Sequence, residues 1–203
     1  MGACHIPLAV YRRLWLLYLI ERFSQACYGN VRLQKVAYFS EKGQQLRPFT
    51  FKKAPRGPYS EDLKEILEQL LSMGLVVAEP LGETGNKYRV TETREGPSRH
   101  ARWLGAVSAS VKAAIESAVE QYGYMRQDSL VDAGHQVDGF DDASFYDVLL
   151  EANAPESVAV GLDEDECEEL ALSLSPGFVG MLRCLADTDW ASSLDKVRLI
   201  EAG

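Results

Sequence analysis

The sequence predicts a mainly α-helical α+β protein: a winged helix-turn-helix with a β-hairpin wing, followed by an all-helical C-terminal part. Residues 30–91 carry the order helix, extended arm, helix and two strands, which is typical of a winged helix. A Gly-Pro break near residue 96 and a change in charge sign follow it. We therefore expect a winged-helix domain at 1–96 and an acidic helical domain at 97–203.

The first two helices are predicted from the spacing of their apolar residues. Pro7 opens a segment that is apolar on nearly every face as far as Phe23, a pattern typical of a buried helix. A second helix is expected to begin with Asn30 as its N-cap and to end near Gly43. Residues 47–53 then alternate apolar and polar side chains, which predicts a short strand or extended arm.

The third helix and the wing complete the predicted domain. Pro58 and Ser60 precede acidic residues that suit a first helical turn, and Gly74 ends the apolar stripe. The β-rich segments 75–78 and 87–91 are separated by a loop rich in Pro, Gly and Asn. They predict a β-hairpin.

Beyond residue 97 the apolar spacing predicts helices throughout. A long helix is expected from Ser98 to Gly123, where residues three and four apart form an apolar stripe. Shorter helices are expected at 128–137, 142–152, 163–174 and 176–186, and residues 193–200 form a last helix or a tail.

The charges divide the chain into two unlike parts. Residues 1–102 hold 16 Lys and Arg against 10 Asp and Glu, whereas residues 103–203 hold 5 against 20. We therefore expect nucleic acid to approach only the first part. The acidic part is as consistent with a solvated helical surface as with a surface for a different partner.

No membrane segment, leader or cofactor is expected. The apolar run from Leu14 to Ile20 is too short to span a bilayer, and the first residues lack the pattern of a signal peptide. Four widely spaced cysteines without a Cys-x-x-Cys pair predict reduced thiols, no metal site and a cytoplasmic location.

The basic residues of the first part are the predicted contacts to a partner or to nucleic acid. The outer face of the third helix carries four carboxylates among six residues, so it is a poor reader of DNA bases. The basic residues lie instead on the second helix, the arm and the wing. They are Arg32, Lys35, Arg47, Lys52, Lys53, Arg56, Lys87 and Arg89.

No catalytic motif emerges, so a non-enzymatic protein is expected. A Gly-x-Ser-x-Gly elbow is missing, and residues 82–87 lack the spacing of a phosphate-binding loop. The acidic run 163–169 lacks the ligand spacing and the central glycine of a calcium loop.

Two runs carry a resemblance to a known family. Residues 32–39 read Arg-Leu-Gln-Lys-Val-Ala-Tyr-Phe and residues 56–60 read Arg-Gly-Pro-Tyr-Ser, followed by a leucine-rich helix. This order resembles the Panacea antitoxin domain and, more loosely, prokaryotic winged-helix proteins with the same Gly-Pro-Tyr-Ser helix start. The residues that carry the resemblance are Leu33, Gln34, Lys35, Tyr38, Gly57, Pro58 and Tyr59.

The resemblance implies a prokaryotic protein of toxin-antitoxin, phage or mobile-element settings that binds another protein. The wing and the acidic extension depart from the family pattern. A structural interpretation of the same residues stands beside it, with Leu33 in the core, Tyr38 packed and Gly57-Pro58 setting a turn. We predict a regulatory protein that binds and neutralises or regulates a toxin-like or other protein partner. The alternative is a DNA-binding transcriptional regulator whose helical part forms a homodimer or senses a signal.

Overall fold

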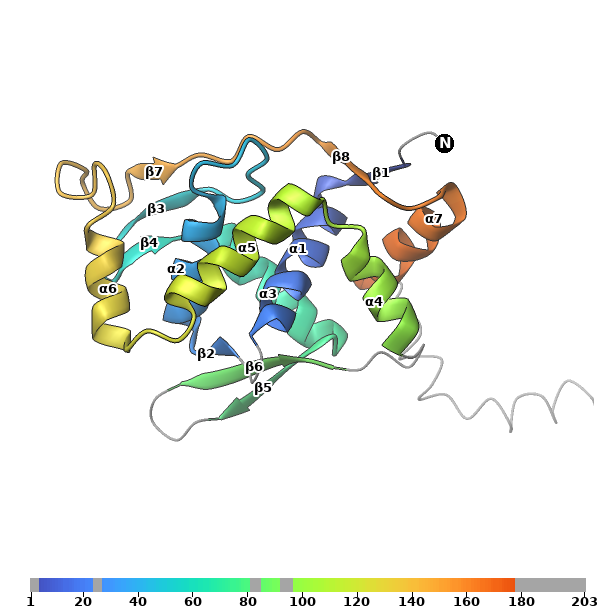
Figure 1. The fold of residues 1–203 in the computed structure, drawn as a ribbon, viewed down its shortest axis with the longest axis horizontal. Helices are drawn as coiled ribbons and strands as arrows, with labels where there is room; N and C mark the ends of the chain where they lie inside the picture. The colour runs from blue at the N-terminus through green and yellow to red at the C-terminus, as the bar shows by residue number, and fades with distance from the viewer. Residues whose placement is uncertain (1–3, 24–26, 81–84, 92–96, 178–203) are drawn as a thin grey trace, which may run out of the picture.

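The computed structural model describes residues 4–23, 27–80, 85–91 and 97–177, and shows a mixed α/β protein (Figure 1). It is about 51% helical and 18% strand, with seven helices among the described residues. The elements, in chain order, are β1 (Cys4–Pro7), α1 (Leu8–Arg22), β2 (Cys27–Tyr28), α2 (Asn30–Glu41), β3 (Phe51–Ala54), β4 (Gly57–Tyr59), α3 (Glu61–Met73), β5 (Val76–Pro80), β6 (Asn86–Val90), α4 (Pro97–Gly105), α5 (Ala109–Tyr122), α6 (Gln127–His135), β7 (Val148–Leu150), β8 (Ser157–Val160) and α7 (Glu164–Ser173).

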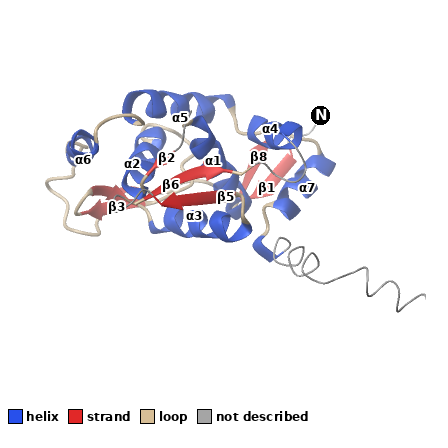
Figure 2. Ribbon diagram, turned by 90° about the horizontal axis from the view of Figure 1, so that it is seen from below, coloured by secondary structure: helices blue, strands red, loops and turns tan. Residues whose placement is uncertain are grey.

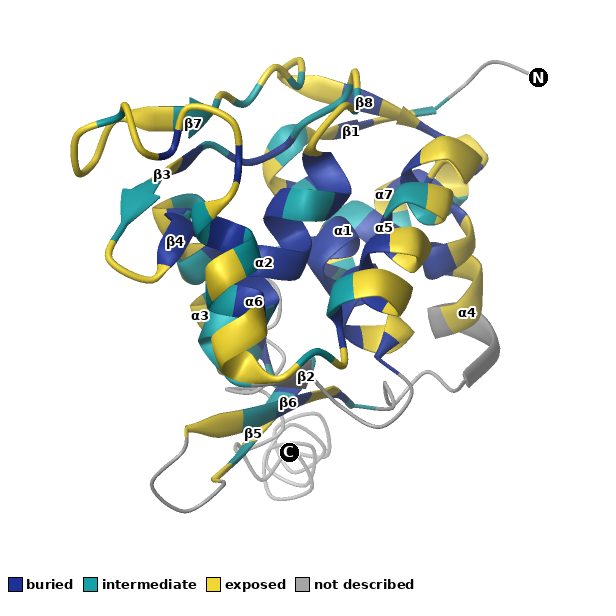
Figure 3. Cartoon of the chain, turned by 60° about the vertical axis from the view of Figure 1, so that its left-hand side comes forward, coloured by how far each residue is buried: buried dark blue, intermediate teal, exposed yellow. Residues whose placement is uncertain are grey.

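Helix α1 lies at the centre of the protein, as its sequence predicts. Leu14, Leu16 and Leu19 have no exposed surface, and the helix contacts α3, α4, α5 and β6. A helix with apolar side chains on every face needs neighbours on every side, and the other elements surround it (Figure 3). No described helix has both the length and the apolar composition needed to cross a bilayer.

The ends of α2 and α3 are set by local chemistry. The side chain of Ser60 caps α3 by accepting a hydrogen bond from the backbone N–H of Leu63 at 3.3 Å, and Gly74 ends the helix in the left-handed conformation. The start of this helix after Pro58 and its end at Gly74 agree with the prediction. The N-cap of α2 is Gly29, with φ of 84°, so the expectation that Asn30 caps this helix is wrong.

The strands form three small antiparallel sheets (Figure 2). Strands β5 and β6 pair from Val76 opposite Val90 to Pro80 opposite Asn86, which confirms the expected pair of strands, and β2 extends this sheet. Strands β3 and β4 pair from Lys52 opposite Tyr59, so the Gly-Pro-Tyr run forms a strand as well as a turn.

The second part of the chain is not all helical, which corrects the prediction. Residues 142–152 form a loop and β7 instead of a helix, and β7 pairs with the open edge of β3. The backbone N–H groups of Asn153 and Ala154 both donate to the carbonyl of Arg47, which extends this contact. Apolar spacing within 142–152 fits a helix, but a partner strand from another part of the chain supplies the backbone hydrogen bonds instead.

The long helix expected from Ser98 to Gly123 is also wrong, because α4 and α5 are separate helices. The chain leaves the helical conformation at 106–108, and Ser108 is extended with φ of −60° and ψ of 150°. The side chain of Lys112 donates to the carbonyl of Gly105 at 2.6 Å, so this carbonyl at the C-terminal end of α4 has a hydrogen-bond partner. The apolar stripe continues across this break, so periodicity alone conceals it.

The two parts of the chain share one hydrophobic core. Ile115 and Leu170 belong to the same buried cluster as the α1 residues, and β1 pairs with β8. The division into two domains, residues 1–96 and 97–203, stays a prediction. The segment around residue 96, the tip of the wing, and all but the first two residues of the helix expected at 176–186 lie outside the described residues, as does the segment expected at 193–200.

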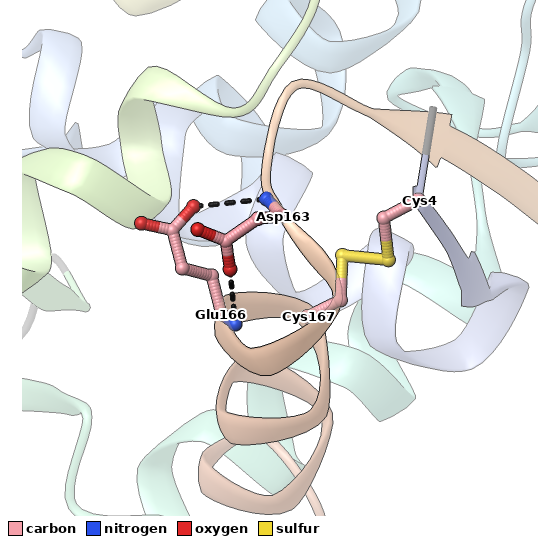
Figure 4. Close-up of a disulfide and its surroundings, with 4 residues drawn as sticks. All are labelled: Cys4, Asp163, Glu166 and Cys167. Atoms are coloured by element: carbon pink, nitrogen blue, oxygen red, sulfur yellow. Dashed lines mark hydrogen bonds between the residues drawn. A yellow bond between two sulfur atoms is a disulfide. The ribbon is translucent and has the colours of Figure 1, made fainter. Parts of the chain in front are cut away.

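Cys4 and Cys167 form a disulfide, so the prediction of four reduced thiols is wrong for this pair (Figure 4). Pairing of β1 with β8, and packing of α7 on β1, bring the two Cα atoms within 6.5 Å across 163 residues of sequence. Just before Cys167, Asp163 and Glu166 form a capping box at the start of α7, in agreement with the prediction of a helix start there. No local spacing in the sequence signals the disulfide.

Candidate binding site at the β3–β4 arm

The two runs that carry the family resemblance meet in the structure. The side-chain amide of Gln34 donates to the carbonyl of Ser60 at 2.9 Å and accepts from its backbone N–H at 2.8 Å. Both residues are buried, with 1% of Gln34 and none of Ser60 exposed. Gln34 therefore fixes α2 against the junction of β4 and α3.

Leu33 and Tyr38 lie in the core, as the structural interpretation of the motif expects. Leu33 has no exposed surface, and the ring of Tyr38 meets the ring of Phe51 edge to face at 5.5 Å. Burial, together with the charge of Asp138, raises the pKa of Tyr38. These two motif residues support the fold around the arm.

Lys35 is buried beside two glycines. It is 2% exposed, and its amine lies against Gly57 of β4 and Gly134 of α6. A Cβ at position 57 would overlap the Lys35 amine, and one at position 134 would lie 2.7 Å from its Cε atom. Gly57 also has a backbone φ of 98°, a conformation that residues with a side chain rarely adopt. Lys35 therefore does not lie on the surface, where the sequence places it as a contact residue.

A cavity of about 330 Å³ lies in front of the Lys35 amine. Helix α2 forms one wall, and the turn between β3 and β4 forms the other. Its lining residues are Asn30, Val31, Gln34, Lys35, Ala54, Pro55, Arg56, Gly57, Pro58 and Tyr59. Five of the seven residues that carry the resemblance line this cavity. The other two, Leu33 and Tyr38, lie on α2, and Tyr38 packs against Phe51 of β3.

Two polar groups of the cavity lack partners. The Lys35 amine makes no hydrogen bond or ion pair with any described residue, and burial lowers its pKa to about 8. The side-chain oxygen Oδ1 of Asn30 is buried and accepts no hydrogen bond from the described residues. Buried polar groups are usually satisfied, so this pair marks the cavity as a candidate binding site.

Three other basic residues of the predicted set bind backbone carbonyls. Arg32 donates to Gly123 and Met125 at 2.7 and 2.8 Å, and Lys53 donates to Phe140 and Ala143. In a third case, Arg47 donates to the carbonyls of Gln44 and Glu151. These side chains join the arm and α2 to the second part of the chain, so they hold the fold together.

The two basic residues of the wing pair with the same carboxylate. Lys87 and Arg89 lie 3.4 and 3.2 Å from the carboxylate of Glu79 on the adjacent strand. The hydrogen bond from Arg89 and the charge of Lys87 lower the pKa of Glu79. Both wing cations are exposed or half-buried, so each pair contributes little to stability.

The side chains of Lys52 and Arg56 remain exposed and make no ion pair or hydrogen bond with a described residue. Exposed apolar side chains occur on β7 and on the loop before it, which bonds to β3 through the Tyr146 N–H and the Lys53 carbonyl: Phe145, Tyr146 and Val148 are 59%, 76% and 52% exposed. Val148 lies directly opposite Lys52 in the β3–β7 pair. We call these five residues the arm patch.

The apolar members of the arm patch were missed because a helix was expected at 142–152. A signal for a loop was present in the sequence, since Gly139, Asp141, Asp142 and Ser144 are typical turn residues. Gly139 indeed has φ of 74°, and the backbone N–H of Ser144 donates to the Asp147 carboxylate.

The acidic face of α3 is present as expected. Glu61, Glu65 and Glu68 are exposed. Two further residues of that predicted face turn towards α1, where Asp62 pairs with Arg12 at 3.0 Å and Gln69 accepts from Arg13. An exposed row of carboxylates disfavours phosphate groups, so this helix is a poor DNA-reading element.

Comparison with known proteins adds no relative. No protein-family model matches the chain, and a search of curated proteins finds no match. The likeness to the Panacea domain therefore depends on the two runs and stays a prediction.

We expect the variant Lys35→Met to be more stable than the wild type at neutral pH, by about 2 to 3 kcal/mol. Burial lowers the pKa of Lys35 from its ordinary value of 10.5 to about 8, so the folded protein binds this proton less tightly than the unfolded chain does. The loss of folding stability caused by the buried charge is complete below pH 8 and decreases to zero as the pH rises to 10.5. Urea unfolding from pH 7 to 10.5 checks this, with Lys52→Met as the exposed control. Equal stabilities of Lys35→Met and wild type at pH 7 would contradict it.

Proposed function

We propose that this chain is a non-enzymatic prokaryotic regulatory protein of winged-helix type that binds and neutralises or regulates a protein partner, in the manner of a Panacea antitoxin. The observation that carries the proposal is the arm patch, which combines the exposed apolar side chains of Phe145, Tyr146 and Val148 with the unpaired cations Lys52 and Arg56, and in which Val148 lies opposite Lys52. The order of α2, α3 and the β5–β6 pair supports the winged-helix assignment.

The composition of the arm patch suits a protein interface. Aromatic and Arg side chains are enriched at the centres of such interfaces, where they supply much of the binding energy. Large exposed apolar side chains gathered in one place often mark an interaction site. The two cations suit a partner with an acidic surface, because complementary charges speed and orient association.

The alternative, a DNA-binding regulator, receives less support. Among the eight predicted contact residues, Lys52 and Arg56 alone are exposed without a partner among the described residues. DNA affinity grows with the number of phosphates that a protein neutralises, so two cations give weak binding that salt abolishes. The acidic face of α3 opposes it further.

The proposed compartment is the cytoplasm, on the expectation drawn from the sequence. The Cys4–Cys167 disulfide counts against a reducing compartment, because such bonds are rare among cytosolic proteins. The oxidation state of this pair in cell extracts, measured by thiol alkylation, therefore tests the compartment independently of the partner.

The double variant Lys52→Glu with Arg56→Glu is expected to lose at least tenfold in affinity for the protein partner, because it reverses both free cations of the arm patch. The assay is co-expression and co-purification with the product of the adjacent gene, followed by titration calorimetry. The matched control is Lys87→Glu with Arg89→Glu, which reverses two paired cations on the wing.

Two outcomes would count against the proposal. Equal affinities for the arm-patch variant and wild type at low salt would remove this surface from the interface. Tight and sequence-selective retention of DNA in a gel shift, at moderate as well as low salt, would favour the DNA-binding alternative instead.

A further inference from the structure

The cavity between α2 and the β3–β4 turn contains a charged group that the proposed function does not use. The Lys35 side chain is 2% exposed, yet it lines the cavity and has no partner among the described residues. Acidic side chains are missing from the lining residues. A buried ammonium without a counter-ion is costly, so its retention calls for a ligand.

We propose that this cavity binds a carboxylate group, which accepts a charge-assisted hydrogen bond from the Nζ atom of Lys35. Such a bond is stronger than a neutral one, and an anion would satisfy the ammonium that the protein leaves unpaired. The side-chain NH2 group of Asn30, which lines the same cavity, can donate a second hydrogen bond to the carboxylate.

The two glycines fix where the amine lies. Because neither Gly57 nor Gly134 carries a side chain, β4 and α6 approach the Lys35 stem and amine closely. Any larger residue at position 57 would occupy the position of the amine. The remaining free side of the amine is the cavity, which is therefore the place where a counter-ion fits.

The lining favours a carboxylate over a phosphate. Val31, Ala54, Pro55 and Pro58 make much of the wall apolar, and Lys35 is the single buried cation of the lining. A phosphate monoester carries nearly two charges and several acceptor oxygens, which this wall would leave unsatisfied. One carboxylate matches one ammonium, and the apolar wall suits a short hydrocarbon chain attached to it.

Arg56 lies at the mouth of the cavity and is exposed. A cation at that position attracts an approaching anion without being desolvated. Because Arg56 also belongs to the arm patch, the carboxylate has two sources, a free small molecule or an acidic side chain of a bound protein. The inference itself depends on the cavity alone and not on the proposed function.

The test is an NMR titration of protein that carries ¹³C-labelled lysine, in which the Lys35 signal is assigned from its absence in Lys35→Met. The probes are acetate, propionate, inorganic phosphate, and the blocked peptides acetyl-Ala-Glu-Ala-amide and acetyl-Ala-Gln-Ala-amide. We expect saturable shifts of the Lys35 signal with propionate or with the Glu peptide, at millimolar affinity, and at least tenfold weaker binding of phosphate and the Gln peptide.

Each result decides the matter. Binding of propionate alone identifies a small-molecule site, and binding of the Glu peptide alone identifies a partner's acidic side chain; both support the proposal. An unchanged Lys35 signal with every carboxylate, or phosphate binding as tightly as propionate, would overturn it.

Calorimetry with two variants supplies the control. Lys35→Met keeps an unbranched apolar stem and removes the amine, and we expect it to lose at least tenfold in carboxylate affinity. Lys52→Met removes an exposed cation outside the cavity lining and is expected to bind as the wild type does. Retained binding in Lys35→Met, with the fold verified by circular dichroism, would overturn the proposal even if the arm patch binds its protein partner.

Discussion

Reducing the Cys4–Cys167 disulfide is expected to lower the free energy of unfolding by about 3 to 5 kcal/mol. The bond joins residues 163 positions apart, so it closes nearly the whole described chain into one loop. A long loop removes more conformational freedom from the unfolded chain than a short one does. Denaturant unfolding with and without a reductant measures the difference.

The variant Cys27→Ser with Cys184→Ser supplies the control, because it keeps only the two cysteines of the disulfide. Thiol titration of this variant under denaturing conditions should find no free thiol before reduction and two afterwards. Two free thiols in the untreated protein, or an unfolding curve that the reductant leaves unchanged, would contradict the prediction. The bond also ties the start of α7 to β1, so its loss should expose α7 to proteolysis first.

Local signals predicted the positions of the first three helices, although the N-cap of the second is Gly29 instead of Asn30. The apolar faces of α1 indicate burial, Ser60 caps α3 and Gly74 ends it, and each of these features depends on residues within a few positions of one another. Such patterns follow from the helix repeat and from the unsatisfied backbone groups at helix ends, so a single sequence contains them.

Pairings between distant segments could not be read from the sequence. Strands β7 and β8 are three and four residues long, and each finds its partner about a hundred or more positions away, in β3 and β1. A segment that is short and only partly apolar fits a helix or a strand equally well, and the open edge of another strand decides between them. The disulfide was missed for the same reason.

The sequence singled out the residues of the candidate site but did not predict their roles. The two runs containing Lys35 and Gly57 stood out, and the structure places them together around one cavity. Charge alone does not distinguish a cation that binds a partner from one that binds the protein's own backbone. Arg32 and Lys53 are of the second kind, and their carbonyl partners lie about 90 positions away in the sequence.

The variant Gln34→Met is expected to lose about 2 to 6 kcal/mol of folding free energy, the largest loss from a single residue of the site. Methionine has nearly the same length and shape, but it leaves the backbone N–H and carbonyl of Ser60 without partners. Each buried group left unsatisfied costs about 1 to 3 kcal/mol. Urea unfolding at neutral pH measures the loss, and Gln45→Met, at an exposed position, is the control, with an expected change below about 0.5 kcal/mol.

The same variant separates the structural role of the motif from its binding role. Gln34 holds β4 against α2, and these two elements form the walls of the cavity beside Lys35. If the hydrogen bonds of Gln34 position those walls, Gln34→Met should weaken carboxylate binding even under conditions where the protein remains folded. A variant that is destabilised yet binds propionate with unchanged affinity would restrict Gln34 to folding, and would leave Lys35 alone to account for the binding.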